Sequence, residues 1–186
     1  MLVVPDCEQL PVAAARAGSP DAWNILFQRY QLPLYTYVFE LVRDEQAALD
    51  VVQETFINAV RHIDGLREDA KFGSWLFGIA HQKCIQRWRK HAREQALRRE
   101  FADAPVEVDD GPLELLIQQE QEAEFMNLLS KLPEAQRSVL LLHFIEEFSL
   151  EEIAEITGAQ LGTVKSRMHY AKKTLRHLWR DYENPA

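Results

Sequence analysis

The hydrophobic side chains of this sequence recur mostly at the three- and four-residue spacing of amphipathic helices. Residues 23–41 show this spacing on both sides of Pro33, which predicts a helix that is broken or kinked there. Residues 47–63 carry a second apolar stripe, with Val60 among the side chains expected to point inward. A third stripe begins at Phe72. No useful length of sequence alternates as a β-strand does, so the pattern predicts an all-α fold.

Residues 149–176 have the layout of a helix-turn-helix. Ser149 and Glu152 stand at the spacing of a capping box, in which two side chains satisfy exposed amides at a helix start. Gly158 follows as a residue able to take the left-handed conformation of a tight turn. The second helix then repeats apolar residues along one face, at Val164, Met168, Ala171 and Leu175.

The opposite face of this second helix carries hydroxyl, basic and aromatic side chains and no acid: Thr163, Lys165, Ser166, Arg167, His169, Tyr170 and Lys173. Hydroxyls and lysines bind DNA phosphates, and an arginine can pair with the edge of a guanine in the major groove. The face therefore predicts DNA binding by the second helix. The alternative is a helical hairpin with a merely charged surface.

Basic residues are concentrated in two segments of an otherwise acidic chain. The formal net charge is −8, yet residues 71–99 hold eight Lys or Arg and one acid. Residues 161–180 hold six Lys or Arg and no acid. Two such segments indicate two separate contacts with a polyanion.

Between these segments, residues 100–124 hold nine acids and no base, and they include Pro105, Gly111 and Pro112. This composition is typical of a flexible linker, which predicts two small helical domains rather than one. The expected division is an N-terminal extension (1–18), a first helical domain (19–99), an acidic linker (100–120) and a second helical domain carrying the helix-turn-helix (121–183).

The segment LPEAQRSVLLLHFIEEFSLEEIAEITGAQLGTVKSRMHYAKKTLR closely resembles the C-terminal domain of extracytoplasmic-function (ECF) sigma factors, subunits that bring bacterial RNA polymerase to promoters. In that family this domain binds the upstream, minus-thirty-five element. The resemblance implies the same role for the basic face above. Tyr170 departs from the family, which more often has a basic residue there.

The segment DVVQETF, from Asp50 to Phe56, resembles the family signature that docks on the clamp helices of the largest polymerase subunit. The helical spacing agrees, because it places Asp50, Gln53 and Glu54 together on the outer face of a helix whose apolar residues point inward. The resemblance therefore implies that these three side chains bind the polymerase core.

The segment FGSWLFGIAHQKCIQRWRKHARE resembles the family region that melts and recognises the minus-ten element. There displaced single-stranded bases enter a pocket, and basic residues follow the DNA backbone. The implied DNA-binding residues are Gln82, Lys83, Arg87, Trp88, Arg89, Lys90 and Arg93. Gln82 and Gln86 depart from the family, which usually has asparagine and aspartate there, and Trp75 is expected in the core.

Other classes of function find less support in the sequence. No catalytic constellation, cofactor motif or zinc pattern is present, and the pair His81 and Cys84 provides too few ligands for a metal site. No apolar run reaches the length of a membrane helix, and the start lacks a signal-peptide pattern, so we expect a cytoplasmic protein. The main rival is a stand-alone helix-turn-helix regulator, which has no obligatory complex with polymerase core. The family also implies an inhibitory anti-sigma partner.

Overall fold

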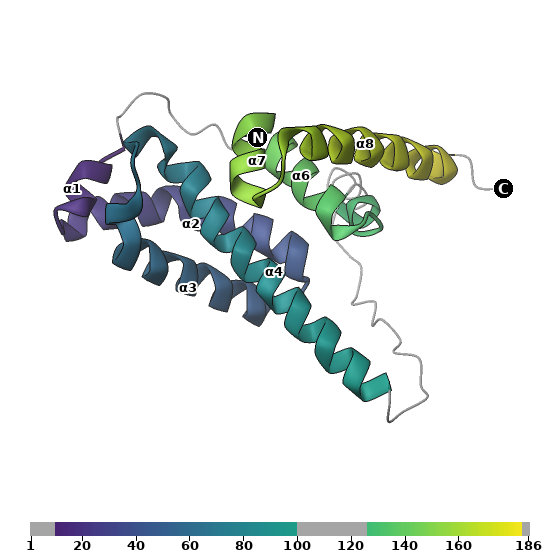
Figure 1. The fold of residues 1–186 in the computed structure, drawn as a ribbon, viewed down its shortest axis with the longest axis horizontal. Coiled ribbons are helices and arrows are strands. Elements are labelled where there is room, and N and C mark those ends of the chain that lie inside the picture. Colours follow the sequence, from purple (N-terminus) through teal and green to yellow (C-terminus); the bar gives the residue numbers. More distant parts are fainter. Residues whose placement is uncertain (1–9, 100–125, 184–186) are drawn as a thin grey trace.

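The computed structural model describes residues 10–99 and 126–183, and for residues 91–99 and 180–183 it describes the backbone only. The predicted linker at 100–120 lies outside these residues. All regular elements within them are helical, as predicted, and none of these helices is apolar over a length that could span a membrane. The α-helices are α1 (Val12–Arg16), α2 (Pro20–Val42), α3 (Glu45–His62), α4 (Phe72–Arg99), α6 (Glu134–Phe144), α7 (Leu150–Thr157) and α8 (Leu161–Glu183) (Figure 1).

Side-chain caps define where three of these helices begin. The Ser19 hydroxyl accepts a hydrogen bond from the Ala22 amide in α2, and the Asp44 carboxylate accepts one at 2.6 Å from the Ala47 amide in α3. At α7 the predicted capping box is confirmed, because Ser149 and Glu152 satisfy each other's amides. The starts of α2, α3 and α7 are therefore properties of the local sequence.

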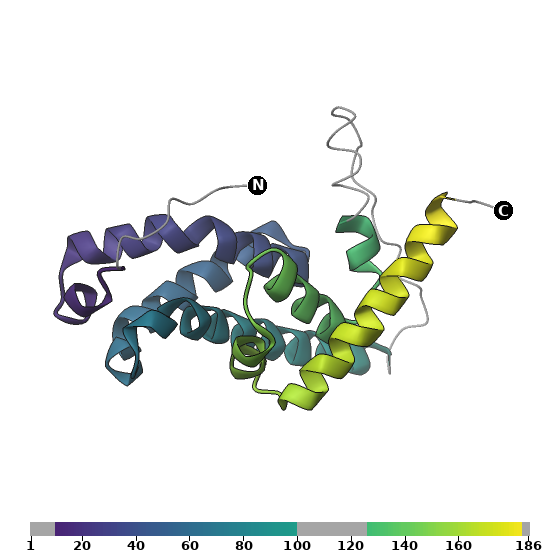
Figure 2. The same ribbon diagram turned by 90° about the horizontal axis from the view of Figure 1, so that it is seen from above.

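In residues 10–99, which we call the N-terminal unit, α2, α3 and α4 pack against one another (Figures 1 and 2). Aromatic and aliphatic side chains form the core of this unit. The chain does not break at Pro33, since α2 continues through it. Leu26 before the proline and Tyr37 after it are buried in the same core, which holds the helix together. Val60 does not point inward as predicted: it is 52% exposed, because it is turned by about 100° from its buried neighbour Ala59.

The short helix α1 belongs to this core, although the sequence pattern gave no sign of it. Val12 and Ala15 are fully buried, and the Trp23 indole donates a hydrogen bond to the Ala15 carbonyl at 3.0 Å. Arg16 reaches across to Asp69 with an ion pair of 2.6 Å. This pair ties α1 to the segment that connects α3 with α4.

Residues 126–183, the C-terminal unit, form the predicted helix-turn-helix. Gly158 ends α7 with φ of 65°, the left-handed conformation that glycine adopts without strain. The apolar residues Ile153 and Ile156 of α7 pack against Val164 and Met168 of α8, and all four are buried. The C-terminal part of α8 projects beyond the other helices of this unit (Figure 1).

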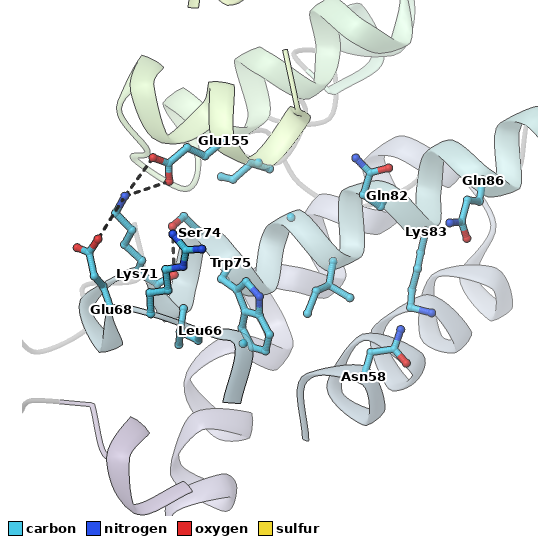
Figure 3. Close-up of a pocket in the computed structure, with 15 residues that line it drawn as sticks. Asn58, Leu66, Glu68, Lys71, Ser74, Trp75, Gln82, Lys83, Gln86 and Glu155 are labelled. Carbon is cyan, nitrogen blue, oxygen red and sulfur yellow. Dashed lines mark hydrogen bonds and ion pairs between the residues drawn. The ribbon is translucent and has the colours of Figure 1, made fainter. Parts of the chain in front are cut away.

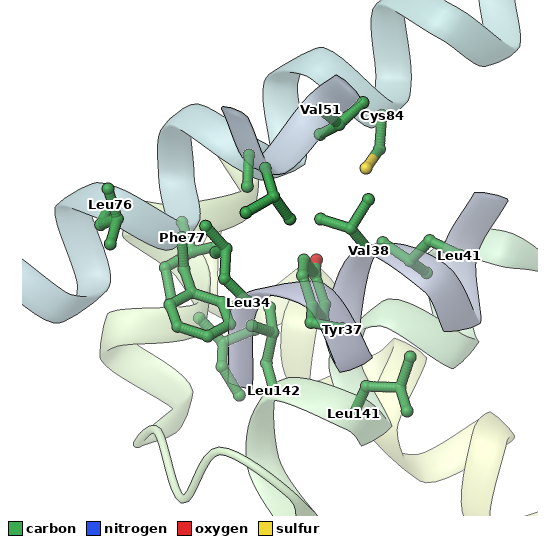
Figure 4. Close-up of a cluster of buried hydrophobic side chains, with 14 of the residues drawn as sticks. Leu34, Tyr37, Val38, Leu41, Val51, Leu76, Phe77, Cys84, Leu141 and Leu142 are labelled. Carbon is green, nitrogen blue, oxygen red and sulfur yellow. The ribbon is translucent and has the colours of Figure 1, made fainter. Parts of the chain in front are cut away.

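The two units share one continuous hydrophobic core. α7 packs against α4, and α6 packs against α2. Leu141 and Leu142 of α6 lie beside Tyr37 of α2 (Figure 4), and the rings of Phe77 and Phe148 meet edge to face at 5.2 Å. The helix-turn-helix therefore lies directly on the helix predicted to melt DNA.

Candidate nucleic-acid interface

A cleft with a volume of about 660 Å³ opens between α3, α4, α7 and residues 65–71 (Figure 3). The two 3₁₀ turns η1 (Ile63–Gly65) and η2 (Asp69–Lys71) bring the end of α3 close to the start of α4. An indole, amides and ammonium groups line the cleft: Trp75, Gln82, Gln86, Lys71 and Lys83. This combination of an aromatic surface, hydrogen-bonding amides and cations suits an unpaired nucleotide.

The residues predicted to contact the minus-ten DNA divide into three groups. Gln82 and Lys83 line the cleft itself. Arg87, Arg89 and Lys90 are exposed on the next turns of α4. Trp88 is half-buried and packs against the core, while the side chain of Arg93 lies outside the described part of the chain.

Two lysines of the cleft are bound to carboxylates. Lys83 donates to Glu54 of α3 at 2.7 Å, which links a predicted DNA contact to a predicted polymerase contact. Lys71 donates to both carboxylate oxygens of Glu155 in α7, at 3.0 and 3.3 Å. The hydrogen bond and the charge of Glu155, with a smaller effect of Glu68, raise the pKa of Lys71. An anion that displaced either carboxylate could bind the ammonium group released by it.

A buried polar cluster lies where the units meet. The Tyr37 hydroxyl and His81 Nδ1 are hydrogen-bonded at 2.8 Å. Burial, and to a smaller degree the charge of Arg167, lowers the pKa of His81 to about 4. Burial raises the pKa of Glu146 to about 7. Burial also raises the pKa of Tyr37, with smaller contributions from Cys84 and Glu146.

The outer face of α3 carries the predicted docking residues. Gln53 and Glu54 are exposed, and Asp50 is half-buried and accepts a hydrogen bond from Gln46 at 3.2 Å. Exposed apolar side chains stand beside them, at Leu49 (47%) and Ile57 (42%). A surface with both acids and exposed aliphatic groups is suited to binding another protein.

On α8, six of the seven predicted DNA-binding side chains are exposed: Thr163, Lys165, Ser166, His169, Tyr170 and Lys173. The Ser166 hydroxyl donates to the Gly162 carbonyl at 2.9 Å, and the His169 and Tyr170 rings meet edge to face. Arg167 differs, because it is half-buried and close enough to α4 to affect His81. The structure therefore separates Arg167 from the rest of the recognition face.

The sequence patterns did not single out several side chains that shape the cleft. Lys71 belongs to a turn, and Glu155 belongs to a helix far along the chain, so no local spacing connects them. Trp75 was expected in the core; its half-buried ring packs against the core, and it also lines the cleft. His81 and Cys84 are buried, and no group of three candidate ligands forms a metal site in residues 10–99 and 126–183.

Two family models match this chain. Sigma-70 region 2 matches residues 26–94, and sigma-70 region 4 matches residues 122–175. The chain is 32% identical over 178 residues to the ECF RNA polymerase sigma factor SigW of Bacillus subtilis, covering 91% of this chain and 95% of SigW. It is 30% identical over 176 residues to the RNA polymerase sigma-H factor of Pseudomonas aeruginosa, covering 90% of this chain and 91% of sigma-H.

Two solved structures resemble the fold. CnrH, determined in complex with the cytosolic domain of CnrY, gives a TM-score of 0.67 at 25% identity, covering 94% of this chain and 98% of CnrH. RpoE, determined with the anti-sigma factor NepR from Bartonella quintana, gives a TM-score of 0.65 at 26% identity, covering 83% of this chain and 96% of RpoE. The two matched regions, the full-length relatives and the helical fold together place this chain in the ECF family of RNA polymerase sigma factors.

Proposed function

We propose that this chain, which as a sigma factor directs transcription initiation, does so through three surfaces with different partners. The outer face of α3 binds the clamp helices of the polymerase core through Asp50, Gln53 and Glu54. The exposed aliphatic side chains beside them, Leu49 and Ile57, extend this contact. Apolar area that is exposed in the free chain and covered in a complex favours binding.

The cleft beside α4 holds an unpaired base of the minus-ten element. The observation that carries this proposal is the set of side chains around it: Trp75 for stacking, Gln82 and Gln86 for base edges, and Lys83 for phosphate. Arg87, Arg89 and Lys90 continue along α4 as an exposed basic path for the DNA backbone. Opened DNA supplies such a base, whereas an intact duplex does not.

The exposed face of α8 binds the duplex at the upstream element. Lys165 and Lys173 contact phosphates, and Arg167 contacts base edges once it is released from α4. An anti-sigma factor is a further expected partner, because both solved relatives named above were determined with a bound protein and NepR is described as an anti-sigma factor. A stand-alone regulator would use α8 but would have no need for the α3 face or the cleft.

Replacing Gln86 by alanine tests the cleft assignment. We expect this variant to change the ranking of promoters that differ in the minus-ten element, with about a fivefold loss on the preferred one, since a net hydrogen bond contributes about 1 kcal/mol. The ranking of upstream-element variants should not change. The measurement is transcription in vitro with core polymerase on a promoter library, with start sites sequenced.

The control is Gln28→Ala, which removes the same side chain from an exposed position on α2 outside the cleft. It should transcribe with the wild-type ranking. If Gln86→Ala also keeps the wild-type ranking, the cleft does not hold the base and the assignment is wrong.

A further inference from the structure

The helix α7 covers part of the cleft that we assign to the DNA strand. Glu155 and Ile156 of α7 are among the residues that line it, together with α4 and residues 65–71 (Figure 3). The two helices are in contact at Gly78 of α4, where a Cβ would lie 3.9 Å from the Ile156 Cα, an ordinary van der Waals distance. Gln82 of α4 points toward α7 in the same view.

The carboxylate of Glu155 is the anion that Lys71 binds in this structure. Lys71 Nζ donates to both oxygens of this carboxylate, and Glu68 stands farther away, at 4.0 Å. A carboxylate and a phosphate offer a lysine the same interaction, an anionic oxygen acceptor at hydrogen-bond distance. Lys71 is exposed enough to exchange one for the other, with 43% of its side chain accessible.

The same packing covers a second DNA-binding side chain. Arg167 of α8 is half-buried and acts electrostatically on His81 of α4. An arginine that is half-buried near α4 is less accessible to a major groove than the exposed side chains of the same face. Each proposed DNA-binding surface is therefore partly covered by the other unit.

We propose that α7 is an internal competitor of the displaced DNA strand, with Glu155 holding Lys71 as a backbone phosphate does when the cleft is occupied. The proposal rests on the function assigned to the cleft. It makes Lys71 a phosphate-binding residue. It also means that the closed packing of the two units and the binding of the DNA strand exclude each other. The apparent affinity for the strand is then the intrinsic affinity multiplied by the fraction of molecules in which the two units are open.

Variants of the whole chain in which one charged side chain is replaced by neutral glutamine separate competition by α7 from a general electrostatic effect. Glu155→Gln removes the competing carboxylate, and Glu151→Gln makes the same charge change on the same helix at an exposed residue that does not line the cleft. Lys71→Gln breaks the same ion pair but also removes the proposed phosphate contact. The probe is a fluorescein-labelled single-stranded oligonucleotide of random sequence, and small-angle X-ray scattering reports the opening of the units.

We expect Glu155→Gln to bind the oligonucleotide about two to five times more tightly than the wild type. This ratio corresponds to the free energy that an exposed ion pair typically contributes. Its radius of gyration should increase only slightly, because the shared hydrophobic core still favours the closed packing. Lys71→Gln should open in the same way but bind no more tightly than the wild type, and Glu151→Gln should differ little from the wild type in either measurement.

Equal affinities of Glu155→Gln and Glu151→Gln would overturn the competitor proposal while leaving the cleft assignment intact. A Lys71→Gln variant that binds as tightly as Glu155→Gln would overturn it as well, because Lys71 would then bind no phosphate. If the scattering shows opening and no variant binds the oligonucleotide at all, the cleft assignment itself fails and the competitor proposal fails with it.

Discussion

Four polar side chains lie at the boundary between the two units, and burial shifts the pKa values of two of them in opposite directions. Tyr37 and His81 come from the N-terminal unit, and Glu146 and Arg167 come from the C-terminal unit. Burial raises the pKa of Glu146 to about 7, so the folded chain holds a proton there that the unfolded chain releases near 4.5. His81 behaves in the reverse way, because its pKa falls from 6.5 to about 4.

The two shifts have opposite effects on stability over nearly the same range. Glu146 makes the fold less stable as pH rises from about 4.5 to about 7, where only the folded state keeps its proton. His81 makes the fold less stable as pH falls from 6.5 to about 4, where only the unfolded state gains a proton. Between about 4.5 and 6.5 the two contributions offset each other, and above 7 only the cost of ionising Glu146 remains.

Replacing Glu146 by glutamine should therefore stabilise the protein at pH 8. The gain is at most about 3 kcal/mol, at 1.36 kcal/mol per unit of pKa shift. The variant should also become less stable as pH falls from 6.5 to about 4, because the contribution of His81 is no longer offset. Urea unfolding followed by circular dichroism between pH 4.5 and 8 measures both effects.

Glu147→Gln is the matched control, since Glu147 is the exposed neighbour of Glu146. Its unfolding free energy should follow that of the wild type at every pH. A Glu146→Gln variant that shows no gain at pH 8 would mean that Glu146 is already ionised without cost in the folded protein.

At the scale of elements, α3 has two faces with different tasks. Its inner face, with Val51, Thr55 and Ala59, is buried against the rest of the N-terminal unit. Its outer face combines the predicted docking residues with exposed aliphatic side chains. A helix whose inner face is tightly packed keeps its shape when its outer face is changed, so the outer face can be tested without unfolding the domain.

The triple variant Asp50→Ala, Gln53→Ala and Glu54→Ala should lose binding to polymerase core while keeping its helical content. Loss of Glu54 also frees Lys83, so the variant should not lose affinity for single-stranded DNA. Core binding is measured by pull-down and by native gel shift, and folding by circular dichroism.

The control for this prediction changes three exposed polar residues of α2 to alanine: Asn24, Gln28 and Gln31. This variant should bind core polymerase as the wild type does. Wild-type binding by the α3 variant would show that polymerase docks elsewhere.

At the scale of the whole molecule, the shared core makes the two units depend on each other. Phe148 lies between them, with its ring against Phe77 of α4, while residues of α6 reach the α2 core. Domains joined only by a linker unfold independently, whereas units with a common core unfold together. The described residues therefore predict one unfolding transition.

Replacing Phe148 by alanine should weaken this coupling. We expect a loss of about 1–3 kcal/mol, less than for a fully buried phenylalanine because Phe148 is half-buried. Differential scanning calorimetry should then show two transitions instead of one. Phe144→Ala removes the same side chain from a largely exposed position on α6 and should leave a single transition. A single transition at the wild-type Tm for Phe148→Ala would show that this contact does not couple the units.

Features that depend on neighbouring residues could be read from the amino-acid sequence alone. The capping box at Ser149, the left-handed turn at Gly158 and the apolar faces of α7 and α8 follow from local spacing, and the structure confirms each of them. The helical fold and the sigma family were also evident from the sequence, because helical periodicity and long motifs lie within continuous segments.

Which of these segments come into contact is a property of the folded chain and not of any local pattern. Lys71 and Glu155 are paired across 84 positions, and Trp75 lines a cleft that no helical pattern indicates. The buried role of α1 and the exposure of Val60 likewise depend on which neighbouring helices cover each position. A periodic pattern tells which face of a helix is apolar but not what covers that face, so the closed packing of the two units was not predictable from it.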